Sequence, residues 1–171
     1  MALQSSFCTH RKFKERKRLV KKSLHNKEDL NEIVMRISQL SENSQRRWGR
    51  MNAAQMLTHC ELILQVPLKK VHLSKPNFIF RAIGILTKKE IQIFNNGIPP
   101  NMPCFRKLIV NFECNFEAAK INLLNTLNEY VKAYENHDLA RSHALFGKMK
   151  EKDWGFMEYK HLNHHLKQFN V

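Results

Sequence analysis

The stretch Y-K-H-L-N-H-H-L-K-Q-F, from Tyr159 to Phe169 near the end of the 171-residue chain, decides the fold. Its apolar residues recur at helical spacing, which predicts the last turns of an amphipathic helix. His161 and His165 are four residues apart, so they lie one turn apart on one side of this helix. There they flank the apolar stripe, and we expect both imidazoles to face the edge of a core.

Two histidines at i and i+4 can direct a ring nitrogen at one metal ion, as they do in zinc-binding helices. The H-x-x-x-H spacing alone fits an ordinary polar helix edge equally well. A third histidine, His59, flanks the apolar stripe of an earlier predicted helix in the equivalent place. A single histidine so placed is more often bonded to a backbone carbonyl, but the three together favour a metal site.

Three more amphipathic helices are predicted upstream. Residues 28–40 follow Asn26 as a potential cap, and a second helix follows Asn52 and Gln55, which have capping-box spacing. A third helix is predicted over residues 112–135, and the fourth begins near residues 150–153. The sequence shows no credible strand alternation, so it predicts an all-α protein, an up-and-down four-helix bundle.

Residues 67–111 form a long crossover between the second and third helices. This segment contains several prolines, an N-N-G turn and the run I-P-P-N-M-P. Phe78 to Phe94 is apolar enough for one or two short helices, which we expect to be broken near Gly84 and Thr87. A crossover of this length usually covers something functional.

The net charge of +14 is unevenly distributed. Residues 1–22 contain eight Lys or Arg and one Glu, which predicts a basic, poorly ordered extension before a domain over residues 23–171. Such an extension could bind nucleic acid or another anionic partner, although a merely solvated segment is favoured. A homodimer is left open.

The four cysteines show no C-x-x-C spacing. This is typical of reduced thiols in a cytoplasmic protein, and it leaves room for one disulfide. No apolar run approaches the roughly 18 residues of a membrane span, and no secretory signal opens the chain.

Three motifs together resemble the DinB-like (DinB/YfiT-type) superfamily of metalloenzymes. They are W-G-R-M-N-A-A-Q-M-L-T-H-C from Trp48, H-A-L-F-G-K-M-K-E-K-D-W-G from His143, and the Tyr159–Phe169 stretch. More narrowly, the chain resembles a branch labelled a domain of unknown function, from about Lys22 onward. The resemblance implies a four-helix bundle that holds a divalent metal through His59, His161 and His165.

Three neutral imidazoles leave coordination positions open for water or substrate, and both zinc and nickel suit this ligand type. Gln55 and Glu158 each lie one turn before a ligand and are candidates for orienting ligands or moving protons, although capping or solvent exposure explains them equally well. Trp154 is expected in the core, and His143 and His164 at the rim of the pocket.

The resemblance implies a metal-dependent enzyme that carries out thiol-dependent transfer, with a low-molecular-weight thiol, or hydrolysis on a small molecule. A basic pocket would favour an anionic substrate. The alternative is a non-catalytic binding or scaffold protein, in which residues 1–22 engage nucleic acid or another anionic partner. Loss of bound metal from His161→Ala would support the enzyme; salt-sensitive binding that requires residues 1–22 would support the alternative.

Overall fold

A computed structural model describes residues 21–95, 97–100 and 102–171 of the chain. The described residues are mostly helical, as predicted for an all-α protein, and include one minimal pair of strands. The elements in chain order are α1 (Lys27–Ser38), α2 (Ala53–Leu64), α3 (Phe78–Phe94), the 3₁₀ turn η1 (Arg106–Leu108), α4 (Phe116–Glu135), β1 (Ser142–His143), β2 (Gly147–Lys148) and α5 (Glu151–Gln168). None of the described helices is long and apolar enough to cross a membrane. The predicted basic extension lies, except for its last two residues, outside the described part.

Asparagine side chains start each of the first four α-helices. Asn26 accepts from the backbone N–H groups of Glu28 and Asp29, and Asn115 caps α4. Asn52 and Gln55 form the predicted capping box at the start of α2. An asparagine oxygen satisfies backbone donors that have no partner inside the helix, so these residues fix where the helices begin. Helix α4 therefore begins at Phe116 rather than at residue 112.

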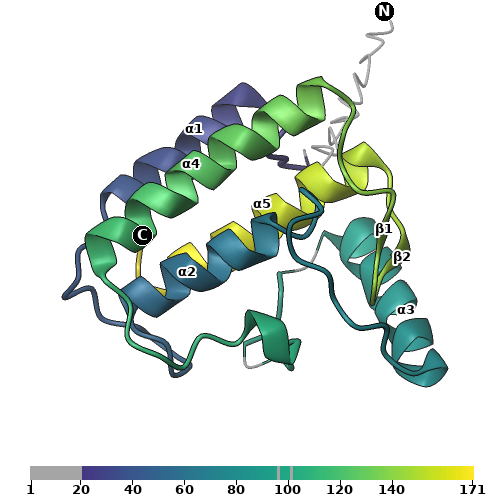
Figure 1. The fold of residues 1–171 in the computed structure, drawn as a ribbon, viewed down its shortest axis with the longest axis horizontal. Coiled ribbons are helices and arrows are strands. Elements are labelled where there is room, and N and C mark those ends of the chain that lie inside the picture. Colours follow the sequence, from purple (N-terminus) through teal and green to yellow (C-terminus); the bar gives the residue numbers. More distant parts are fainter. Residues whose placement is uncertain (1–20, 96, 101) are drawn as a thin grey trace, which may run out of the picture.

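Helices α1, α2, α4 and α5 gather around one apolar core, while α3 stands apart at the edge of the molecule (Figure 1). Helix α2 packs mainly on α4, and α5 packs on both α1 and α2. The largest fully buried side chains are those of Leu24, Ile33, Ile37, Met56, Leu57, Leu64, Leu108, Leu123, Leu127, Tyr130, Trp154 and Leu162. This pairing of α2 with α5 is what brings the two histidine-bearing helices together.

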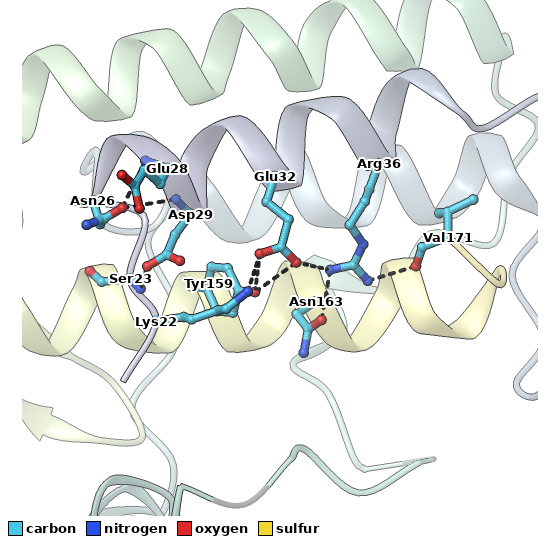
Figure 2. Close-up of polar contacts among 10 residues, drawn as sticks. All are labelled: Lys22, Ser23, Asn26, Glu28, Asp29, Glu32, Arg36, Tyr159, Asn163 and Val171. Atoms are coloured by element: carbon cyan, nitrogen blue, oxygen red, sulfur yellow. Dashed lines mark hydrogen bonds and ion pairs between the residues drawn. The ribbon is translucent and has the colours of Figure 1, made fainter. Parts of the chain in front are cut away.

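A polar network fastens α1 to α5 on the outer side of the core (Figure 2). Glu32 of α1 accepts from Lys22, from the Tyr159 hydroxyl at 3.2 Å and from Arg36 at 3.3 Å. Partial burial of Glu32 opposes its ionisation, but the hydrogen bonds from Lys22 and Tyr159 lower the pKa of this carboxyl overall. Arg36 also donates to Asn163 Oδ1 at 2.9 Å, so its guanidinium joins the two helices directly.

Helix α3 is one continuous helix of 17 residues, and the predicted break near Gly84 and Thr87 is wrong. Gly84 is used for a close approach instead: a Cβ atom there would lie 2.4 Å from the Leu145 side chain. Packing against Leu145 offsets the usual cost of glycine inside a helix. The helix ends at Asn95, which adopts the left-handed conformation with φ of 53°.

The segment before α5 is a short hairpin rather than a plain loop. Ser142 and His143 pair with Gly147 and Lys148 in antiparallel register. The Nδ1 atom of His143 accepts two hydrogen bonds across the turn, from the backbone N–H groups of Leu145 at 3.1 Å and of the next residue at 3.2 Å. Only a neutral imidazole can accept at Nδ1. Burial, and then the nearby Lys88 ammonium, lower the pKa of His143 to about 4.

We expect Arg36→Ala to lower the free energy of unfolding by about 2 kcal/mol, because it removes charge-assisted hydrogen bonds between α1 and α5. Urea unfolding at neutral pH measures this difference. Lys132→Ala, at an exposed position of α4, is the matched control and is expected within about 0.5 kcal/mol of wild type. Equal stability of both variants would contradict the role given to the network.

The pKa of His143 gives a second expectation. The unfolded chain binds a proton near pH 6.5, whereas folded His143 binds one only near pH 4. Its contribution to stability is therefore complete above pH 6.5 and is lost as the pH falls toward 4, by about 3 kcal/mol in all.

His143→Asn keeps a hydrogen-bond acceptor that does not titrate in this range, so its stability should fall less steeply over the same interval. Urea unfolding at pH 7 and at pH 4.5, with a chelator present in both, measures the two slopes. The other histidines contribute equally to the pH dependence of both proteins, so their contributions cancel when the two slopes are compared. Parallel slopes would contradict the assignment.

Candidate metal centre

Helices α2 and α5 bring His59, His161 and His165 to one point. The three ring centroids lie 4.6–5.1 Å apart, and one ring nitrogen from each lies within 4.8 Å of the others. The Nε2 atoms of His59 and His161 are 3.2 Å apart. His59 and His165 are buried, whereas His161 is partly exposed. The structure thus gathers all three histidines that the sequence singled out.

The tautomer of His59 follows from its surroundings. Its Nδ1 atom lies 2.7 Å from the backbone oxygen of Leu108, in η1 of the crossover. A carbonyl oxygen can only accept, so Nδ1 carries the proton and donates it. The lone pair of Nε2 is then directed at the other two histidines, as a metal ligand requires.

His165 is oriented through a longer chain of hydrogen bonds. Its Nδ1 atom lies 2.8 Å from Gln168 Oε1, and Gln168 Nε2 donates to the backbone oxygen of Trp48 at 2.6 Å. Because the Trp48 oxygen must accept, the orientation of the Gln168 amide is fixed and its Oε1 receives the His165 proton. Gly49 has φ of 79°, and a Cβ there would lie 2.5 Å from Gln168 Nε2. Only glycine fits this position, which explains the W-G pair of the sequence motif.

His161 has one ring nitrogen to which no described residue forms a hydrogen bond. Its Nδ1 atom is buried without a hydrogen-bond partner among the described residues. Its Nε2 atom faces the lone pair of His59 at 3.2 Å. Tetrahedral zinc with bonds of about 2.0–2.1 Å places two nitrogen ligands about 3.3 Å apart, so the spacing of these atoms fits a shared ion.

Burial keeps the three imidazoles neutral. Desolvation is the largest cause in each case: it lowers the pKa of His59, lowers that of His161 well below 6.5, and lowers that of His165 to about 3. Neighbouring histidines act in the same direction, because a second positive charge beside the first is unfavourable. At neutral pH all three offer lone pairs, and no proton has to leave before a cation binds.

The two residues proposed to assist the ligands differ in their surroundings. Gln55 is occupied by the start of α2: its Oε1 accepts from Asn52 N–H, and its Nε2 donates to the Phe112 oxygen at 3.0 Å. Glu158 is 4 % exposed, and its Oε2 atom is buried with no hydrogen-bond partner in the described part of the chain. Burial raises the pKa of Glu158 to about 8, so this carboxyl is protonated at neutral pH.

Of the other expected residues, Trp154 lies in the core and His164 at the edge of the cluster, whereas His143 lies in the hairpin and lines neither of the cavities described below. Trp154 is buried and donates its indole N–H to the Ala140 oxygen at 2.6 Å. His143 belongs to the hairpin described above. The ring of His164 lies 5.7 Å from that of Trp48 and 5.0 Å from that of His165, measured between centroids, and it lines a small cavity together with Trp48.

Positive side chains line the cavities on this side of α5. A cavity of about 150 Å³ is bordered by His164, Trp48 and Ile98, and a wider groove of about 510 Å³ runs between α1 and α5. Lys160, Asn163 and Lys167 line both. Neither cavity is lined by His59, His161 or His165. His164, whose ring centroid lies 5.0 Å from that of His165, connects the smaller cavity to the cluster.

We expect Gln168→Leu to weaken zinc affinity by about 10–100-fold, because the buried His165 Nδ1–H loses its acceptor. Competition with a chromophoric chelator measures the affinity. Gln168→Glu keeps an acceptor for His165 and should stay closer to wild type. Circular dichroism checks that both variants are folded, and wild-type affinity in a folded Gln168→Leu variant would contradict this role.

The comparisons with known proteins identify one family. The chain matches a family described as Protein of unknown function (DUF1569) over residues 19–171. The comparison with curated proteins finds no match, and neither does the comparison with solved structures. Since the match covers most of the chain, the protein belongs to the DUF1569 family.

Proposed function

We propose that this protein is a metal-dependent enzyme of the DinB-like superfamily, with the up-and-down four-helix bundle of that group. His59, His161 and His165 would hold one divalent ion, either zinc or nickel. The reaction would be a thiol-dependent transfer or a hydrolysis on a small anionic molecule. The observation that carries the proposal is the convergence of three neutral imidazole nitrogens within 4.8 Å.

The donor set suits a catalytic ion better than a structural one. Structural zinc sites have four protein ligands, whereas catalytic sites have three and keep a position open. Among the described residues, the group that could hold an ion consists of three histidines. An ion held in this way can lower the pKa of a bound water or thiol.

Glu158 is the residue we propose to move a proton. It lies one turn before His161 on α5, and its raised pKa of about 8 keeps a proton on the carboxyl near neutral pH. A general acid or base works best when its pKa is close to the operating pH. Its buried, unpaired Oε2 atom has no competing hydrogen bond among the described residues.

The smaller cavity, which His164 connects to His165, has a basic lining that favours an anionic substrate. Lys160 and Lys167 lie on the same side of α5 as His164, and Asn163 adds a neutral donor between them. Trp48 and Ile98 supply an apolar wall. A carboxylate-bearing thiol combines an anionic group with a soft ligand for the ion, so it fits this lining.

The test begins with the metal. Protein purified without a histidine tag is expected to contain one divalent ion per chain by elemental analysis. After chelation, zinc or nickel should restore thermal stability, with a gain of about 2.7 kcal/mol at a metal concentration 100 times the Kd. His161→Ala should lose both the ion and the gain. The control, His72→Ala, changes an exposed histidine outside the site and should retain them.

The chemistry is tested separately. The metallated protein is incubated with carboxylate-bearing thiols and small electrophiles, and conjugates are detected by mass spectrometry; ester and amide substrates test hydrolysis. If the protein binds metal but catalyses neither transfer nor hydrolysis, the proposed reaction is rejected and the proposed metal site is retained. Absence of bound ion in wild type, with no response to added metal, would overturn both.

A further inference from the structure

Helix α3 exposes apolar side chains where a surface helix normally exposes polar ones. Ile79, Ile83, Leu86 and Ile93 are between 52 % and 70 % exposed. Their spacing places them on one side of the helix, the side that faces away from the core. Helix α3 lies at the edge of the molecule, below the hairpin and away from the other long helices (Figure 1). This side of the helix is called the outer face below.

Aromatic side chains border the outer face at both ends. Phe78 is 82 % exposed, Phe80 is 61 % exposed, and Phe94 is 64 % exposed at the last turn. Single exposed apolar residues are ordinary in soluble proteins, but a contiguous set on one helix face marks an interaction surface.

The inner face of α3 already has its contacts. Gly84 lies against Leu145, Ile91 is buried, and Lys88 Nζ donates to the Lys148 backbone oxygen at 2.6 Å. The helix is thus attached to the hairpin without any help from the outer face. The outer apolar side chains are therefore available to a partner outside the described chain.

The charge of this region identifies the partner. Residues 68–112 contain eight Lys or Arg and one acid, Glu90. Lys69 and Lys70 pair with Asp138 and Glu129, and Lys88 is buried, so within the described chain five of the eight contribute free positive charge. Lys75, Arg81 and Lys89 are exposed on or just before α3. A second copy docked symmetrically on the outer face would bring two such basic regions together, which is unfavourable. A surface with negative headgroups above an apolar layer complements both the charge and the apolar side chains.

We infer that α3 docks on an anionic lipid bilayer, lying in the plane of the interface. In this arrangement Ile79, Ile83 and Leu86 enter the boundary between headgroups and acyl chains, and Lys89, which flanks the outer face, pairs with the headgroups. Phe, Leu and Ile on one face with nearby basic residues is the pattern of interfacial helices. Glu90, which shares the outer face, limits the depth of insertion to the headgroup region.

Vesicle co-sedimentation of the full chain tests the proposal. The vesicles consist of phosphatidylcholine alone or with about one third phosphatidylserine. Wild type should bind the anionic vesicles at least about tenfold more tightly, and added salt should weaken this binding. The double variant Ile83→Ser/Leu86→Ser should lose about tenfold or more in affinity.

Matched controls separate the outer face from general surface effects. Ile121 of α4 is 56 % exposed, so Ile121→Ser removes similar apolar area elsewhere and should leave affinity unchanged. Lys75→Glu/Lys89→Glu should weaken binding to the anionic vesicles, whereas Lys132→Glu on α4 should not.

Several outcomes would overturn the proposal. One is failure of wild type to bind anionic vesicles; another is equal binding by wild type and the Ile83→Ser/Leu86→Ser variant, because the attachment would then lie elsewhere. Analytical ultracentrifugation tests whether a second copy occupies the outer face instead. If wild type is a dimer that does not bind vesicles, and the Ile83→Ser/Leu86→Ser variant is a monomer, the outer face is a dimer interface.

Discussion

Three neutral imidazoles packed with ring nitrogens facing one another impose the main constraint on this structure. His59 and His165 each donate their Nδ1–H to a protein acceptor, so both Nε2 lone pairs are directed into the cluster. The one proton of neutral His161 can satisfy only one of them, across the 3.2 Å between its Nε2 and that of His59. The arrangement persists because packing of α2 on α5 fixes the two backbones, while the Leu108 oxygen and Gln168 fix two of the rings. A divalent ion would satisfy all three nitrogens together.

Much of the fold could be predicted because it depends on local signals. Apolar periodicity located the helices, and the Asn52–Gln55 spacing gave the start of α2. The prediction for α3 was wrong because it treated Gly84 as a local signal for a break. The residue that makes this glycine favourable, Leu145, belongs to a hairpin far along the chain, and no periodicity reveals that contact.

The sequence could predict which histidines come together at the candidate site, but not the groups that orient them. His59, His161 and His165 could be placed on the inner edges of two helices from spacing alone. The group that orients His59 is a backbone carbonyl, which has no signature in the sequence. Gln168 was detectable in principle, since it follows His165 by three residues on the same helix, but its second contact with Trp48 depends on the tertiary structure.

Gly49 affects the histidine cluster from outside it, because its side chain is only a hydrogen atom and leaves room for the Gln168 amide. It has no contact with an ion or substrate, yet any side chain there would displace the Gln168 amide and free the His165 ring to turn. Substitutions at this loop position would therefore resemble loss of a ligand in a functional screen. The residues needed to shape this centre extend into a surface turn that a search limited to its immediate neighbours would pass over.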